Sequence, residues 1–129
     1  MTIGDAGTSS AGPVADQGRL RVDTRQTGGA VVCTLVGELD LDSLTPARAA
    51  LDEAVGSGPA QLVVDLAGVQ FCDSSGLNLL LQTRLAAQAA DVPLALVSLV
   101  PQVARVFEIT GAESVFSIHA SVDEAFAAR

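Results

Sequence analysis

The sequence predicts an α/β fold with a mixed, mostly parallel sheet, an N-terminal β-hairpin and about four helices. Two apolar segments are joined by Gly28-Gly29, which is typical of a hairpin turn. Further along, apolar segments of strand length alternate with segments of helical spacing, as in parallel strands connected by helices. With 129 residues the chain has room for one packed core. We expect a flexible N-terminal tail over residues 1–18 and one domain over residues 19–129.

The first predicted elements are the two strands of the hairpin and a helix. Residues 20–25 alternate between apolar and polar, which is typical of a half-exposed strand, and residues 31–36 form its partner. Thr45 and Pro46 indicate the start of a helix, with Thr45 as the cap and Pro46 in the first helical position. This helix is expected to end at residues 56–59.

The centre of the chain combines a strand and a helix. Residues 61–66 are apolar at nearly consecutive positions, so we expect a strand that is covered on both faces. The spacing then changes, which predicts a helix from Ser74 or Ser75 to about Ala90. Four leucines recur at helical spacing and indicate its buried side: Leu77, Leu80, Leu81 and Leu85.

The remaining elements continue the alternation. Residues 94–100 predict another strand, residues 101–110 a helix and residues 115–118 a short strand. Ser121 is followed three residues later by Glu124, a capping-box pattern that predicts the start of the final helix.

Composition excludes several kinds of partner. Aromatic residues make up 3% of the chain and the net charge is −8, whereas nucleic-acid binding depends on basic residues and aromatic stacking. No apolar segment approaches the roughly 20 residues of a membrane-spanning helix. The N-terminus lacks the basic start and apolar centre of a secretory signal. We therefore expect a cytoplasmic protein with reduced thiols and neither a nucleic-acid nor a membrane partner.

Enzymatic and metal sites are not indicated. No base accompanies a Ser nucleophile and no glycine-rich phosphate loop is present, so we expect no enzyme, no catalytic residues and no cofactor. Glu38, Asp40 and Asp42 are close in sequence, but no His or further acid completes a metal ligand set. Cys33 is expected to be a core residue. A redox-sensor role for Cys72 would require a lowered pKa, and no basic residue lies nearby in the sequence.

The triplet Asp73-Ser74-Ser75 lies where the predicted central helix begins. Asp and Ser are favoured there because their side-chain oxygens accept the unpaired N–H groups of the first turn. A hydroxyl at this position is also a good phosphorylation site, since a helix N-terminus stabilises negative charge. The spacing alone does not choose between Ser74 and Ser75.

Two motifs carry a resemblance to a known family. Phe71 followed by Asp73-Ser74-Ser75-Gly76-Leu77 resembles the phosphorylation loop of bacterial anti-sigma factor antagonists, which are single STAS domains. Upstream, Gly37-Glu38-Leu39-Asp40 is similar to a second motif of that family. The resemblance covers roughly residues 20–129 and implies the STAS fold.

The resemblance also implies a function. An anti-anti-sigma factor of this kind binds, in its unphosphorylated form, an anti-sigma factor that is also a serine kinase, and so frees a sigma factor for transcription. The kinase then phosphorylates the Ser that follows the Asp, here Ser74, with Ser75 as the second candidate, and a PP2C-type phosphatase reverses the modification. The alternative is a STAS module that scaffolds or senses a ligand in a stress-signalling complex without switching.

The expected partner surface is built from both motifs and the helix that follows. Asn78 replaces the Gly of many relatives and would influence which partner fits. Leu79 lies off the stripe formed by Leu77 and Leu81, so it is either partly exposed beside the motif, where it could contact a partner, or packed in a wide stripe around a buried helix. The expected partner-binding residues are Gly37, Glu38, Asp40, Asp73, Ser74, Ser75, Gly76, Asn78 and Leu79.

Overall fold

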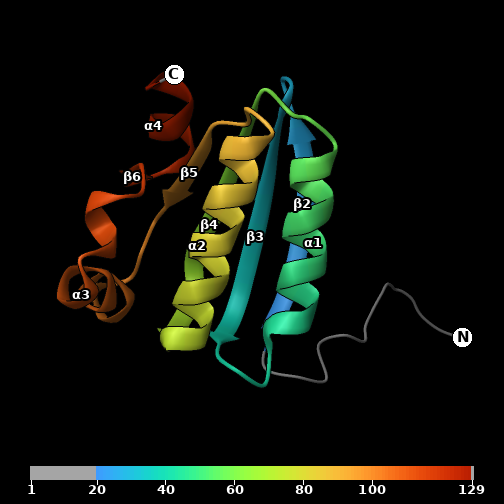
Figure 1. Cartoon of the computed structure of the whole chain (residues 1–129). Helices are drawn as coiled ribbons and strands as arrows, with labels where there is room; N and C mark the ends of the chain where they lie inside the picture. Colours follow the sequence, from blue (N-terminus) through green and yellow to red (C-terminus); the bar gives the residue numbers. More distant parts are fainter. Residues whose placement is uncertain (1–19, 129) are drawn as a thin grey trace, which may run out of the picture.

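The computed structural model describes residues 20–128, and the tail expected over residues 1–18 lies outside them. Five strands form one sheet in the order β2-β3-β4-β5-β6. The strands are β2 (Leu20–Thr27), β3 (Ala30–Leu39), β4 (Gln61–Cys72), β5 (Leu94–Val97) and β6 (Ile118–His119). The helices are α1 (Leu44–Gly56), α2 (Ser74–Ala89), α3 (Pro101–Thr110) and α4 (Val122–Ala127), with a short 3₁₀ helix, η2 (Ala112–Ser114) (Figure 1).

The predicted hairpin and mixed sheet are confirmed. β2 pairs with β3 in antiparallel orientation, and the three remaining neighbour pairs are parallel. Gly28 and Gly29 have φ angles of 57° and 85°, the left-handed conformation that a two-residue hairpin turn requires. The parallel connections run through α1, α2 and α3, as the alternation of segments predicted.

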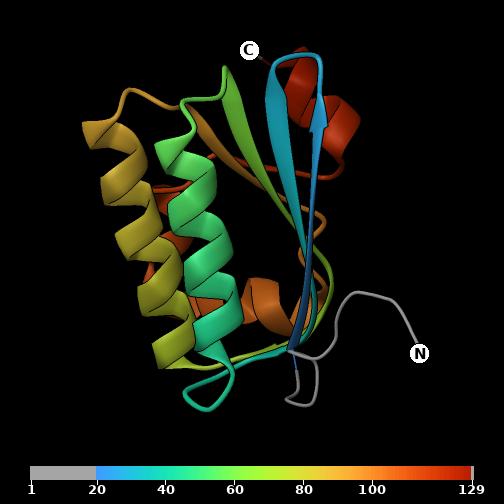
Figure 2. The same cartoon turned by 90° about the vertical axis from the view of Figure 1, so that its right-hand side faces the viewer.

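The sheet is covered unequally on its two faces. α1 and α2 lie side by side over one face, whereas α4 lies on the other (Figure 2). The larger apolar core lies between the sheet and helices α1, α2 and α3, and a smaller cluster packs around Ala125 of α4. β4 contributes to both clusters through Val64 and Val63, so the expectation that this strand is covered on both faces is confirmed for this part of it.

β3 and β4 are longer than predicted. β3 continues to Leu39, and β4 continues to Cys72 where a loop was expected after Leu66. The two strands remain paired to their ends, with Leu39 opposite Cys72 and two register irregularities on the way. Pairing with a neighbour therefore keeps the segment around Gly68 extended, although its local sequence indicates a loop.

Three other boundaries differ from the prediction. α1 begins at Leu44 with Ser43 in the capping position, rather than with Thr45 as the cap. β5 ends at Val97, and Ser98 then adopts a φ of 63° that takes the chain out of the sheet. The last strand is Ile118–His119 rather than residues 115–118, and residues 115–117 connect it to η2.

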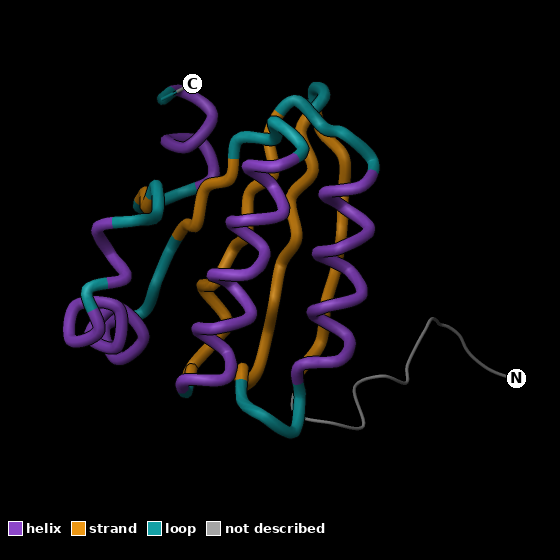
Figure 3. The backbone as a smooth tube through the Cα atoms, viewed as in Figure 1, coloured by secondary structure: helices purple, strands orange, loops and turns teal. Residues whose placement is uncertain are grey.

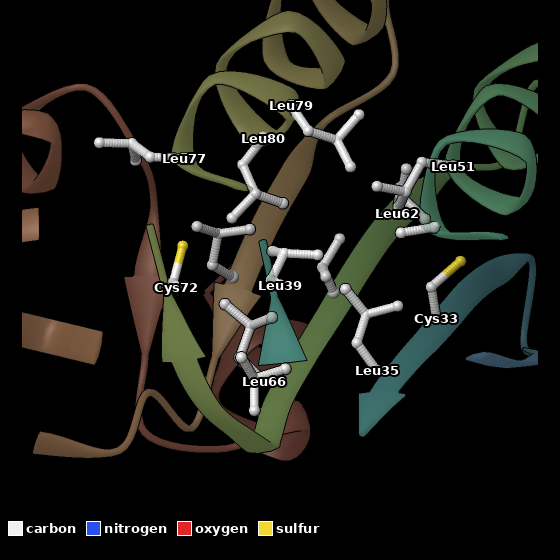
Figure 4. Close-up of a cluster of buried hydrophobic side chains, with 14 of the residues drawn as sticks. Cys33, Leu35, Leu39, Leu51, Leu62, Leu66, Cys72, Leu77, Leu79 and Leu80 are labelled. Carbon is white, nitrogen blue, oxygen red and sulfur yellow. The ribbon is translucent and has the colours of Figure 1, made fainter. Parts of the chain in front are cut away.

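The buried side of α2 also differs. Leu77 and Leu80 are buried as predicted, but Leu85 is 60% exposed and Leu79 is only 1% exposed. Leu79 and Leu80 both extend from α2 into the core, toward the strands (Figure 4). Of the two alternatives for Leu79, packing in the core is the one observed, so its assignment to the partner surface is wrong.

Candidate functional site

The two motifs meet at one end of the sheet. Leu39 of the first motif pairs with Cys72, and the Asp73 N–H donates a hydrogen bond to Leu39 O at 3.2 Å. Because β3 and β4 are parallel, the loop that follows β3 and the start of α2 lie at the same edge (Figure 3). Two segments more than thirty residues apart in sequence thus form one surface.

Gly76 sets the distance between α2 and β3. A Cβ atom at this position would overlap Leu39 O and would lie 2.9 Å from Leu39 Cγ. Only glycine allows the first turn of α2 to approach the end of β3 so closely. Gly76 is buried, so it contributes close packing here rather than an exposed side of the site.

Asp73 is the N-cap of α2. Its Oδ1 accepts a hydrogen bond from Gly76 N–H at 3.0 Å, and its backbone is extended, with φ −96° and ψ −173°. This geometry satisfies one of the unpaired donors of the first turn. Capping of α2 is therefore explained by Asp73 without a contribution from either serine.

Ser74 occupies the first helical position and is exposed, whereas Ser75 is half-buried. Among residues 20–128, neither hydroxyl is hydrogen-bonded to the protein. The fold thus makes no visible use of the Ser74 hydroxyl, which lies beside the positive end of the α2 dipole. Asn78, one turn further along, is exposed on the same helix.

The loop between β3 and α1 is closed by a hydrogen-bonded turn. Ser43 N–H donates to Asp40 O at 3.0 Å, and Asp42 N–H donates to Asp40 Oδ1 at 3.1 Å. The Ser43 hydroxyl lies 2.6 Å from Glu38 O and 2.9 Å from Asp40 Oδ1, and it accepts from Asp40 N–H at 3.1 Å. Ser43 is buried although it is polar, and its hydrogen bond to Glu38 O holds this loop against the end of β3.

Ser43 was not identified from the sequence as part of the site. The signal was present, since Asp followed three residues later by Ser before a helical segment is typical of side-chain capping and turn formation.

Gly37 has a structural reason to be glycine as well. Its φ is 126° and it adjoins a register irregularity in the β3–β4 pairing, where a side chain would strain the backbone.

Cys72 points into the core beside Asp73. Burial, with a smaller contribution from the Asp73 charge, raises the pKa of this thiol to about 12. Burial also raises the pKa of Cys33. Thiol reactivity requires the thiolate, so neither environment favours a redox sensor.

Two exposed apolar residues next to the motifs were also missed. Leu41, in the β3–α1 loop, is 72% exposed, and Phe71, near the end of β4, is 49% exposed. Burial is not visible in a sequence, so the exposure of these side chains was not predictable from the residue type.

Two other kinds of site find no support in the described part of the chain. Within residues 20–128 no three His, Cys, Asp or Glu side chains are grouped to hold a metal ion. None of the helices in this range has both the length and the apolar character to cross a membrane.

Comparisons with known proteins agree on one family. The model of the STAS domain family matches residues 21–125. The anti-sigma-F factor antagonist RsfB of Mycobacterium tuberculosis is 34% identical over 64 residues, which cover 50% of this chain and 52% of RsfB. The match therefore spans about half the length of that relative. An anti-sigma F factor antagonist of Lysinibacillus sphaericus is 32% identical over 94 residues, 72% of this chain and 78% of that protein.

Solved structures share the fold. An anti-sigma factor antagonist from Mycobacterium paratuberculosis superposes with a TM-score of 0.76 at 27% identity, over 84% of this chain and 92% of that chain. SpoIIAA in its unphosphorylated form has a TM-score of 0.69 at 26% identity, over 82% of this chain and 93% of that chain. The Bacillus SpoIIAA in its phosphorylated form has a TM-score of 0.64 at 26% identity, over 83% of this chain and 97% of that chain.

Proposed function

This chain belongs to the STAS domain family, and we propose that it is an anti-sigma factor antagonist controlled by phosphorylation at Ser74. Its unphosphorylated form binds an anti-sigma factor that has serine kinase activity, and a sigma factor is thereby freed for transcription in the cytoplasm. Phosphorylation ends the interaction, and a PP2C-type phosphatase restores it. In this cycle the chain is a ligand and a kinase substrate, not an enzyme.

The observation that carries the proposal is the division of roles at the start of α2. Asp73 accepts the capping hydrogen bond, so the exposed Ser74 hydroxyl has no capping function to explain it. The half-buried Ser75 is less accessible to a kinase. Two relatives named anti-sigma factor antagonists support the class, and the similar SpoIIAA has been solved in phosphorylated and unphosphorylated forms.

The geometry also indicates how the switch acts. A phosphate brings about −1.5 to −2 charges at neutral pH, and the N-terminus of α2 stabilises such a charge through its dipole. The fold should therefore tolerate phosphorylated Ser74. A protein packed over this surface would have to desolvate the phosphate together with the adjacent Asp73 carboxylate, which costs several kcal/mol per ion in the absence of new pairing.

A capture experiment tests the proposal. The wild-type chain and the variants Ser74→Ala and Ser74→Asp serve as baits in lysate of the source organism, and the bound proteins are identified by mass spectrometry. We expect a kinase-like partner on the wild-type and Ser74→Ala baits and its loss from the Ser74→Asp bait. Identical capture by all three baits would contradict a switch at Ser74 and would favour a non-switching STAS scaffold.

A further inference from the structure

Leu41 is held in an unusual place for an apolar residue. It is the first of the two central residues of the turn that the Ser43 N–H to Asp40 O hydrogen bond closes. Turn corners of this kind favour Pro and small polar residues, whereas here a leucine is 72% exposed. The hydrogen bonds of Asp40, Asp42 and Ser43 fix the turn without using the Leu41 side chain.

Phe71 is the second exposed apolar side chain at this edge. Its neighbour Cys72 is buried in the core, so Phe71 points to the other face of the strand. Its backbone is fixed by pairing with Glu38 at the end of β3. Phe71 remains 49% exposed in that position, so much of its ring is not used for packing within residues 20–128.

The two residues are close enough for one partner to cover both. Phe71 is opposite Glu38, and Leu41 follows Glu38 by three residues. With about 3.8 Å per residue and about 4.8 Å between strands, their Cα atoms lie within roughly 16 Å of each other. A standard interface buries about 800 Å² on each partner, an area roughly 30 Å across. Ser74 is three residues beyond Phe71, so its Cα lies within the same span.

The surroundings of these residues are acidic. Asp42 follows Leu41, Asp73 lies between Phe71 and Ser74, and the whole chain carries a net charge of −8. The partner surface that fits here is apolar and free of acidic side chains, because like charges placed across an interface cost several kcal/mol.

We propose that Leu41 and Phe71 are apolar anchors that insert into two apolar pockets on the anti-sigma partner, whose surface around these pockets carries no acidic side chains. This inference rests on the proposed function and names the contacts of that same site. Phe71 is paired in the sheet and Leu41 lies in a hydrogen-bonded turn, so docking has to order the two side chains but little of the backbone. A phosphate on Ser74 would add negative charge to this acidic edge and so disfavour the docked state.

The test measures affinity for a defined probe. The partner captured by the Ser74→Ala bait is identified and purified, and its dissociation constant is measured by isothermal titration calorimetry with the wild-type chain and variants. Leu41→Ala and Phe71→Thr are expected to weaken binding by at least about tenfold each, as truncation of a central apolar anchor does. Leu41→Met and Phe71→Leu, which keep an apolar group, are expected to weaken binding by less than about threefold.

Matched controls come from the chain itself. Ile109 on α3 is 76% exposed and Leu85 on α2 is 60% exposed, and Ile109→Ala and Leu85→Ala are expected to leave the affinity unchanged. Unchanged thermal unfolding midpoints verify that all variants are folded. If the partner binds the wild type and is lost with Ser74→Asp, yet the Leu41 and Phe71 variants bind like the controls, the anchors are refuted and the switch stands. If Ser74→Asp retains the partner, or no partner is captured, the proposed function fails and the anchors fail with it.

Discussion

Replacement of Gly76 by Ala tests whether the close approach of α2 to β3 determines the geometry of the site. In an ordinary helix interior this change stabilises a protein by about 1 kcal/mol, since Ala has the higher helix propensity. Here the added Cβ meets the backbone carbonyl of Leu39, which cannot rotate away as a side chain would. Overpacking of this kind costs about 1 to 3 kcal/mol, and more where the backbone must shift.

We expect a net loss of about 2 kcal/mol of unfolding free energy, because the contact outweighs the gain in propensity. Urea unfolding followed by far-ultraviolet circular dichroism measures this directly. For a chain of this size the midpoint should fall by about 1 M urea. Since α2 must move away from Leu39, partner binding should weaken as well.

Gly56→Ala is the matched control. Gly56 is the last residue of α1, and a Cβ there would meet nothing within 4 Å. This variant should be neutral or more stable by up to about 1 kcal/mol. If Gly76→Ala is as stable as Gly56→Ala, the Leu39 contact does not constrain α2, and our explanation for the glycine of this motif is wrong.

Three further predictions concern the same region. Asp73→Ala should lower the unfolding free energy by about 1 kcal/mol through loss of the cap, whereas Asp73→Asn should retain most of it, as urea unfolding will reveal. Leu79→Ala should lower the unfolding free energy by about 2 to 5 kcal/mol because a buried side chain is removed. Leu85→Ala should change it by less than about 0.5 kcal/mol. Equal effects would contradict the assignment of Leu79 to the buried side of α2 and of Leu85 to the exposed side. The Cys72 thiol has a pKa of about 12 in the folded chain and of 9.0 in the unfolded chain, so between these pH values only the unfolded thiol loses its proton. Stability should therefore fall above pH 9 by up to about 1.4 kcal/mol per pH unit from this group, and a Cys72→Ala variant should show a shallower decline.

Much of the fold was predictable because local signals and tertiary structure agree. A two-residue hairpin turn needs positive φ angles, which Gly28 and Gly29 adopt without steric cost, so the turn was visible in the sequence. Asp73 caps α2 and Ser121 caps α4, where the Ser121 hydroxyl accepts from Glu124 N–H at 3.1 Å. These features involve residues at most three positions apart, and a sequence pattern describes them fully.

The extension of β4 was not predictable for the opposite reason. Residues 67–72 include Gly68 and alternate irregularly, so locally they indicate a loop. They are extended because the end of β3 lies alongside and pairs with them. The juxtaposition of the two motifs, which defines the candidate site, depends on this pairing, so only the family resemblance suggested it from sequence.

The buried side of α2 was misjudged because small and polar residues occupy it. Gly76, Thr83 and Ala87 are buried, and the Thr83 hydroxyl donates to Leu79 O at 3.0 Å, which satisfies it inside the core. Apolar spacing selects Leu85 instead, which is exposed, whereas Leu81 is half-buried and packs against the core as predicted. The same error assigned Leu79 to the partner surface, whereas the exposed apolar residues next to the motifs are Leu41 and Phe71.

The central claim is that phosphorylation at Ser74 controls partner binding. The most direct measurement uses the chain phosphorylated by its captured kinase partner, with the modified residue mapped by tandem mass spectrometry and the affinity of both forms compared by calorimetry. We predict a single phosphate on Ser74, an unfolding midpoint close to that of the unmodified chain, and a loss of affinity of at least about a hundredfold, of the size that uncompensated burial of a charge produces. A phosphate on Ser75 instead, or equal affinities of the two forms, would contradict the account.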